Sequence, residues 1–153
     1  MMRLASLLRP ELIFVELPAV SWEEVLRLAA ARIAASGRVA TAADLAERLL
    51  AREASSPTGL GDGIALPHCK VPNLEAPLVA VGTVEAPGAS RSADADTVRV
   101  FFLVISPEAQ PAMHLQVLAA ISRWLKERGR VEQLVAARSP GEVLALLGDG
   151  DAT

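Results

Sequence analysis

The first third of the chain combines an apolar strand pattern with two helical patterns. A short apolar run between two prolines, residues 13–17, predicts a strand. From Ser21 onward the apolar positions recur every three or four residues, as they do in an amphipathic helix. Ser21 and Glu24 form a capping box at its start, and Gly37 ends it. A second helix is predicted over residues 41–52.

The middle of the chain changes to the pattern of β-strands. Three apolar runs predict strands at residues 64–66, with an extension toward Val71, at 78–84 and at 98–105. The last two runs are almost continuously apolar, which is typical of strands covered on both faces. Residues 86–97 are rich in proline, glycine, serine and aspartate, so they predict an exposed connection that is too short to separate two domains.

The last third returns to helical spacing. Residues 112–128 predict a helix whose one face carries His114, Leu118, Ile121 and Leu125. A final helix begins at the capping box Ser139 to Glu142 and ends at Gly148, so residues 149–153 are expected to form a frayed tail. One strand, two helices, three strands and two or three helices predict a layered α/β fold with a mixed sheet, in a single domain over residues 1–148.

Composition narrows the possible functions of the 153 residues. A formal net charge of -3 and only five aromatic side chains argue against nucleic-acid binding. One cysteine excludes an internal disulfide framework, and no apolar run reaches the roughly 20 residues needed to cross a bilayer. The N-terminus lacks the features of a secretory signal, so we expect a cytoplasmic protein without direct membrane insertion.

The segment GLGDGIALPHCK, residues 59–70, offers several kinds of chemistry. A phosphate-binding loop is disfavoured because no Gly-Lys-Ser/Thr opens a helix here, so the glycines are interpreted as a tight turn. A metal site is disfavoured because His68 and Cys69 would point to opposite faces of a strand. No Gly-x-Ser-x-Gly elbow of a serine hydrolase occurs, and Cys69 is interpreted as a small buried apolar residue. We therefore expect neither a cofactor nor a metal.

The remaining kind of chemistry is a histidine that acts as a nucleophile. An imidazole with a pKa of about 6.5 is largely unprotonated at cellular pH and can attack a phosphoryl group. Arg52 precedes this segment and is a candidate ligand for phosphoryl oxygens, while His114 is a candidate second imidazole. Each of the three residues, taken singly, can also be interpreted without a function. His68 would then be a solvated residue at a strand end, His114 a core histidine and Arg52 a surface arginine.

Together these residues resemble a known family. Arg52-Glu53, the segment TGLGDGIALPH at residues 58–68, Pro107 and the later His114-Leu115-x-x-Leu118-Ala119 are similar to the type-2 enzyme IIA family of the bacterial phosphotransferase system, in its fructose, mannitol and nitrogen-regulatory branch. The intervals of 16 residues from Arg52 to His68 and 46 from His68 to His114 also agree. The resemblance extends from Leu7 to about Leu147.

The resemblance implies an enzyme of the phosphotransferase system that works through a phosphohistidine. It implies that His68 is phosphorylated by the phosphocarrier HPr or a related protein, that His114 and Arg52 steady the phosphoryl group, and that the fold is a three-layer α/β/α sandwich around a small mixed sheet. The resemblance also implies a shallow apolar surface around His68 at which the donor would dock. Leu60, Ile64 and Leu66 are candidates for this surface, or else they belong to the hydrophobic core.

Two roles follow from the resemblance and stay open. In the first, His68 passes the phosphoryl group to a sugar-specific IIB protein. In the second, a nitrogen-type regulator, the phosphorylation state of His68 controls binding to target proteins. A binding module that has lost phosphotransfer is a third possibility, disfavoured because His68, His114 and Arg52 are all present. Pro57, Cys69 and the connection 86–97 depart from the family pattern and leave donor and acceptor open.

Overall fold

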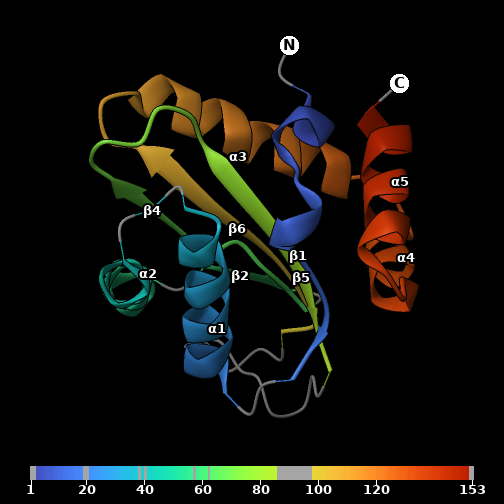
Figure 1. Ribbon diagram of the computed structural model, residues 1–153. Coiled ribbons are helices and arrows are strands. Elements are labelled where there is room, and N and C mark those ends of the chain that lie inside the picture. Colours follow the sequence, from blue (N-terminus) through green and yellow to red (C-terminus); the bar gives the residue numbers. More distant parts are fainter. Residues whose placement is uncertain are drawn as a thin grey trace.

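The central layer of the molecule is an open mixed sheet with helices on both faces (Figure 1). The computed structural model describes residues 3–18, 21–37, 39, 41–56, 58–61, 63–85 and 98–151. The strands of this part are β1 (Ile13–Leu17), β2 (Gly59–Gly61), β3 (Ile64–Ala65), β4 (His68–Val71), β5 (Leu78–Val84) and β6 (Val100–Pro107). Its helices are α1 (Trp22–Ala35), α2 (Ala42–Ser55), α3 (Pro111–Leu125), α4 (Arg130–Ala136) and α5 (Pro140–Asp151), preceded by two short 3-10 helices, η1 (Leu4–Leu7) and η2 (Pro10–Leu12).

The strands are ordered β1-β5-β6-β3-β2, with β4 also paired to β6. β1 and β5 are parallel, β5 and β6 antiparallel, and β6 is parallel to both β3 and β4. Because β5 occupies one edge of β6, β3 and β4 must share the other edge. There β3 pairs with Val100 and Phe101, and β4 pairs with Val104 to Pro107.

Each face of the sheet has its own hydrophobic core. Helices α1 and α2 cover one face, and α3, α4, α5 and η1 cover the other (Figure 1). Along β6, Phe101, Leu103 and Ile105 belong to the first core, whereas Val100, Phe102 and Val104 belong to the second. This alternation follows from the period of two in a strand, and it places both faces of β6 in apolar surroundings.

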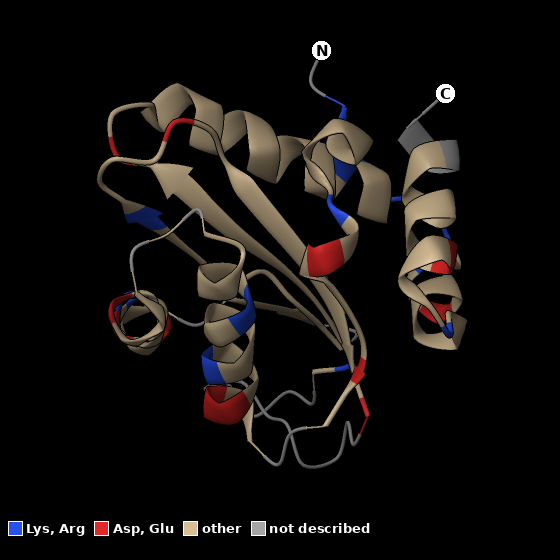
Figure 2. Ribbon diagram, in the orientation of Figure 1, with Lys and Arg blue, Asp and Glu red and all other residues tan. Residues whose placement is uncertain are grey.

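The middle of the sheet has no room for an additional side chain at Gly82 on β5. A Cβ atom there would lie 2.4 Å from the ring of Phe101 on the neighbouring strand. Strands β5 and β6 carry no charged residue, and Figure 2 shows them without charge colours along their length, whereas the edge strand β4 carries Lys70. The prediction that these two strands are covered on both faces is therefore confirmed, since every residue of both is buried.

Several predicted elements are confirmed, as is the α/β class with a mixed sheet. The strand at residues 13–17 and the one at 78–84 have the predicted bounds. The N-caps also form: the hydroxyl of Ser21 accepts from the backbone N–H of Glu24, that of Thr41 from Asp44, and that of Ser139 from Glu142. Caps and strict periodicity are local signals, which explains why the sequence alone predicted these elements.

Other expectations differ from the structure. Gly59 to Gly61 form a short strand rather than a turn, and only Gly63, with φ +81°, lies in the turn that follows. Residues 64–71 are two strands instead of one. The helix predicted over 112–128 ends at Leu125, with a separate helix α4 after Gly129, whose φ is +84°. The last helix continues to Asp151, three residues past its predicted end.

Some sequence features lie outside the described residues, among them Pro57 and the connection 86–97. In the part of the chain that the structure describes, no helix has the length and apolar character required to cross a membrane.

Candidate functional site

The break between β3 and β4 shapes the candidate site. Pro67 interrupts the strand because proline lacks the N–H that a ladder requires. The carbonyl of Pro67 accepts from the N–H of Val104 on β6, and the N–H of Leu66 donates to the carbonyl of Thr58. β4 then begins at His68. The break therefore presents His68 at the edge of the sheet next to a backbone carbonyl, that of Leu66.

The two ring nitrogens of His68 have different partners. Nδ1 lies 2.8 Å from the carbonyl oxygen of Leu66, which can only accept, so Nδ1 carries the proton. Nε2 lies 3.1 Å from Nη2 of Arg52, a permanent donor, so Nε2 is the acceptor with the lone pair. The neutral imidazole is thereby held in one tautomer whose unprotonated nitrogen faces a guanidinium.

Arg52 reaches this position from the last turn of α2. Its Nη1 donates to the carbonyl of Ser56, 2.9 Å away, just past the end of the same helix. This bond anchors one side of the guanidinium and leaves Nη2 directed at His68. Within the described residues, Arg52 has no ion-pair partner, so its charge stays available to an anion.

His114 approaches from the opposite side of the site. It lies in the first turn of α3, which begins a few residues after β6 ends. Helix α3 covers the face of the sheet opposite to α2 (Figure 1). The ring centroids of His114 and His68 are 5.2 Å apart, with their planes inclined at 51°. His114 is 6 % exposed, and its Nδ1 lies 2.6 Å from the Oγ of Ser106 near the end of β6.

Both histidines are held neutral by their surroundings. Burial lowers the pKa of His68 below its usual value of 6.5, and the nearby Arg52 charge lowers it further, against the opposing effect of the Leu66 carbonyl. Burial, together with the charge that His68 carries when protonated and the charges of Lys70 and Arg52, lowers the pKa of His114 to about 4. At neutral pH the site thus contains two uncharged imidazoles beside fixed cations.

A pocket of about 550 Å³ opens at this point and is lined by Arg48, Ala51, Arg52, His68, Cys69, Lys70 and His114. Three of these side chains are cationic although the chain as a whole carries a net charge of -3. Arg48 pairs with Asp44 at 3.0 Å and with Glu108 at 3.5 Å, which ties α2 to the end of β6. The pocket therefore combines a nucleophilic nitrogen with positive charge, which suits an anionic reactant.

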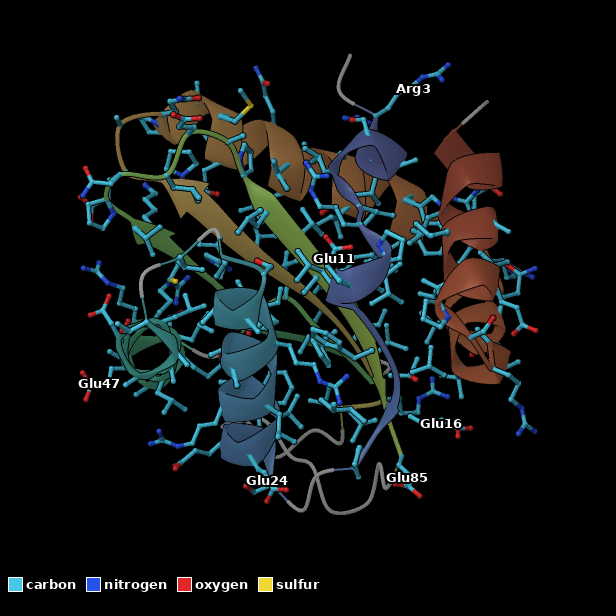
Figure 3. The ribbon with its side chains drawn as sticks, viewed as in Figure 1. Arg3, Glu11, Glu16, Glu24, Glu47 and Glu85 are labelled. Atoms are coloured by element: carbon cyan, nitrogen blue, oxygen red, sulfur yellow. The ribbon has the colours of Figure 1, made fainter. Side chains whose placement is uncertain are left out.

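A buried carboxylate supports the site from behind. Glu53 follows Arg52 on α2 and is 5 % exposed, unlike the glutamates of the surface such as Glu47 and Glu85, which point away from the fold in Figure 3. Its carboxylate accepts from Nε1 of Trp22, from the backbone N–H of Thr58 and from the Thr58 hydroxyl, at distances of 2.6 to 3.1 Å. These bonds fix the end of α2 against α1 and the start of β2.

The structure brings together all three residues singled out in the sequence, His68, His114 and Arg52, although 62 residues separate the first and last of them along the chain. Cys69 is buried, and burial raises the pKa of its thiol to about 12. No group of three or more potential metal ligands occurs among the described residues. Of the candidate docking residues, Leu60 is 55 % exposed, Ile64 is half-buried and Leu66 is in the core.

Sequence reasoning missed two contributors, the Leu66 carbonyl and Ser106. No side-chain pattern marks a backbone carbonyl as a partner of His68. Ser106 did leave a signal, because it is a hydroxyl at the end of the apolar run of β6. The sequence analysis also did not consider Leu115 as a docking residue, although Leu115 is 67 % exposed next to His114.

The fold and the site define an α/β protein that presents an unprotonated imidazole nitrogen in a cationic pocket at a sheet edge. The family model described as phosphoenolpyruvate-dependent sugar phosphotransferase system, EIIA 2, matches residues 6–149. The chain belongs to this family.

Relatives carry names from both branches of the family. The chain is 33% identical over 144 residues to a nitrogen regulatory protein of Pseudomonas aeruginosa, covering 94% of this chain and 93% of that protein. It is 32% identical over 140 residues to the fructose-specific EIIA component of Haloferax volcanii, covering 91% and 90% of the two chains.

Solved structures agree with the fold. The nitrogen regulatory protein IIA-Ntr of Neisseria meningitidis superimposes with a TM-score of 0.83 at 26% identity, over 94% of this chain and 97% of that one. Enzyme IIAMTL of Escherichia coli, solved in complex with phosphorylated enzyme IIBMTL, gives a TM-score of 0.76 at 25% identity, over 93% and 97%.

Proposed function

We propose that this protein is a phosphoryl relay in which Nε2 of His68 carries the phosphoryl group. One observation carries the proposal: the Leu66 carbonyl holds the proton on Nδ1, so that the lone pair of Nε2 faces Arg52 and the pocket. A neutral imidazole in this tautomer is nucleophilic without a separate base. The lowered pKa of His68 keeps it in that form at cellular pH.

The chemical step follows from this tautomer. The lone pair of Nε2 attacks phosphorus, and the bond between phosphorus and the donor atom breaks, leaving its electron pair on the donor. The His68 ring gains positive charge as the new bond forms. Its Nδ1–H bond to Leu66 then becomes charge-assisted, which makes that bond stronger than in the resting protein.

Arg52 and His114 act on the phosphoryl oxygens. Arg52 Nη2 contacts Nε2 of His68 in the resting site. Once Nε2 is phosphorylated, Nη2 donates to the phosphoryl oxygens instead of to the lone pair of Nε2. The anchoring bond from Nη1 to Ser56 keeps the guanidinium in place. His114 stays uncharged, because its pKa is about 4, and supplies a hydrogen bond from the other side. Removing one such donor costs on the order of a hundredfold in rate.

The donor in this proposal is an HPr-like phosphocarrier protein, and the acceptor is a IIB protein. The IIB acceptor is supported by the Escherichia coli neighbour, since enzyme IIAMTL was solved together with phosphorylated enzyme IIBMTL. Exposed Leu115, directly after His114, and Leu60 on β2 offer apolar contacts for either partner. The relay would operate in the cytoplasm, where phosphoenolpyruvate is produced.

A regulatory role is the second candidate. It is supported by the match of nearly full length to the Pseudomonas aeruginosa nitrogen regulatory protein, as the first role is by the match to the Haloferax volcanii fructose-specific EIIA component. In that case His68 would be phosphorylated in the same way, but its phosphorylation state would change binding to target proteins instead of supplying a IIB protein. Both roles begin with phosphoryl transfer from the donor to His68. They differ in whether the phosphoryl group then passes to a IIB protein or stays on His68 and changes the binding of target proteins.

The test is transfer of labelled phosphate from phosphoenolpyruvate through enzyme I and HPr. We expect label on the wild type and none on His68→Ala or His68→Gln. We expect His114→Ala to retain some label and to transfer it onward more slowly. An unlabelled wild type with a competent donor system would contradict the relay, and label persisting on His68→Gln would contradict the assignment of His68.

A matched control comes from the surface of α2. Glu47 is exposed on the same helix as Arg52, and Glu47→Gln should be labelled like the wild type. Addition of purified IIB proteins then separates the two roles. Rapid loss of label to a IIB protein supports transport, whereas retention of label by all of them, with binding partners that change on phosphorylation, supports regulation.

A further inference from the structure

Ser106 is a buried hydroxyl directly behind the candidate site. Residues of β6 alternate between the two faces of the sheet, and those at even positions from Val100 onward belong to the core under α3. Ser106 continues that series, so it faces α3 where the three preceding even positions are apolar. It is fully buried, and its Oγ lies 2.6 Å from Nδ1 of His114.

The need of the buried hydroxyl for an acceptor indicates which atom donates. Among the described residues, the Oγ of Ser106 has no hydrogen-bond partner besides Nδ1 of His114. If Nδ1 carried the proton and donated to Oγ, the buried O–H of Ser106 would be left without an acceptor, which is unfavourable. The contact therefore fits an O–H bond from Ser106 to an unprotonated Nδ1. A neutral imidazole has one N–H, which must then be on Nε2.

We propose that Ser106 is a positioning residue that fixes His114 in the tautomer with its proton on Nε2, so that His114 can donate to the phosphoryl group on His68. The orientation follows from the same contact. Nδ1 is occupied by Ser106 behind the site, and Nε2 remains for the pocket that His114 and His68 line together. This inference rests on the proposed relay for its consequence, but the tautomer itself is a property of the resting protein.

The consequence for catalysis is specific. The partner of one imidazole nitrogen decides what the other nitrogen can do. Without the Ser106 hydroxyl, His114 populates both tautomers, and in one of them it presents a lone pair instead of a donor to the phosphoryl oxygens. Ser106 therefore acts only through His114, without touching the reacting atoms.

The tautomer is measured by long-range ¹H–¹⁵N spectra of the ring nitrogens, which distinguish protonated from unprotonated nitrogen. The chain has only two histidines, so the His68→Gln variant assigns the signals of His114. We expect unprotonated Nδ1 and protonated Nε2 in the wild type near neutral pH, and averaged values in Ser106→Ala. A proton on Nδ1 in the wild type, or ring signals unchanged in Ser106→Ala, would overturn the proposal.

Kinetics provide the second readout. We expect Ser106→Ala to slow onward phosphoryl transfer about five- to tenfold, the effect of losing one well-placed hydrogen bond. In a His114→Gln background the same substitution should have no further effect, because its partner is gone. An equal slowing in both backgrounds would show that Ser106 does not act through His114 and would overturn the positioning role.

Thr83 supplies the control for loss of a buried hydroxyl. It is also buried in the sheet, on β5, where its Oγ1 accepts from the backbone N–H of Glu16. Thr83→Val should alter stability but neither the His114 signals nor the transfer rate.

If the wild type is never labelled, the relay is wrong, while the ring spectra of the unphosphorylated protein still decide the tautomer.

Discussion

The two histidines use the same ring nitrogen in opposite ways. Nδ1 of His68 donates to the carbonyl of Leu66, and Nδ1 of His114 accepts from the hydroxyl of Ser106. The nitrogens facing the pocket are then a lone pair on His68 and an N–H on His114. In the proposed relay, the groups behind the two identical side chains thus prepare His68 as the nucleophile and His114 as a hydrogen-bond donor.

Stability should depend on pH through the buried histidines. The pKa of His114 is about 4 in the folded protein and about 6.5 in an unfolded chain, so the unfolded state binds more protons between these values. The free energy of unfolding therefore decreases as pH falls from 6.5 to 4. The lowered pKa of His68 acts in the same direction.

We expect His114 to account for at most about 2 kcal/mol of the stability lost between pH 7 and pH 5. Urea unfolding of the wild type and His114→Gln at both pH values measures this. The difference between the two pH values should be smaller in the variant. An equal pH dependence in both proteins would show that His114 titrates normally in the folded state.

At the scale of elements, Glu53 joins three parts of the chain. Its carboxylate on α2 accepts from Trp22 on α1 and from Thr58 at the start of β2. The indole of Trp22 and the backbone N–H of Thr58 can only donate, so they require an acceptor at this position. Because Arg52 is the preceding residue, the same contacts hold the guanidinium near His68.

We expect Glu53→Leu to lower the free energy of unfolding by about 1–3 kcal/mol, because the buried N–H groups of Trp22 and Thr58 lose their acceptor. The exposed Glu47→Leu on the same helix should change it by less than about 0.5 kcal/mol. Urea titrations of the three proteins give the comparison. Equal midpoints for Glu53→Leu and wild type would mean that the buried carboxylate contributes nothing to stability.

The sequence predicted elements well where the signals were local. Capping boxes located α1 and α5, α2 was predicted close to its observed bounds, and uninterrupted apolar runs located β5 and β6. β2 was missed because its three residues contain two glycines and pair only with the two residues of β3, so no alternation of side chains marks it. The candidate site was recognised through three side chains, whereas its supporting groups depend on tertiary contacts that no spacing reveals.

At the scale of the whole molecule, the two cores share β5 and β6. Each strand contributes side chains to both, so neither core can lose its packing while the strands keep theirs. Such sharing favours a single cooperative unfolding transition. The chain contains two tryptophans, and Trp22 lies in one core and Trp124 in the other, which provides a reporter for each face.

We expect Trp22→Phe and Trp124→Phe each to unfold in one step, with fluorescence and far-UV circular dichroism giving the same midpoint within each variant. The midpoints of the two variants will differ, since Trp22→Phe also removes a hydrogen bond to Glu53. Fluorescence that changes before circular dichroism in either variant would reveal a face that opens on its own.

The broken edge strand limits how this fold can change in length. Residues 64–65 and 68–71 pair with the same strand, and only Leu66 and Pro67 separate them. Because side chains alternate between faces, one residue inserted or deleted there, with the register set by β3 kept, would move His68 one position along β6 and turn its side chain to the other face of the sheet. Among related sequences, insertions are therefore to be expected in other connections, while this two-residue step keeps its length.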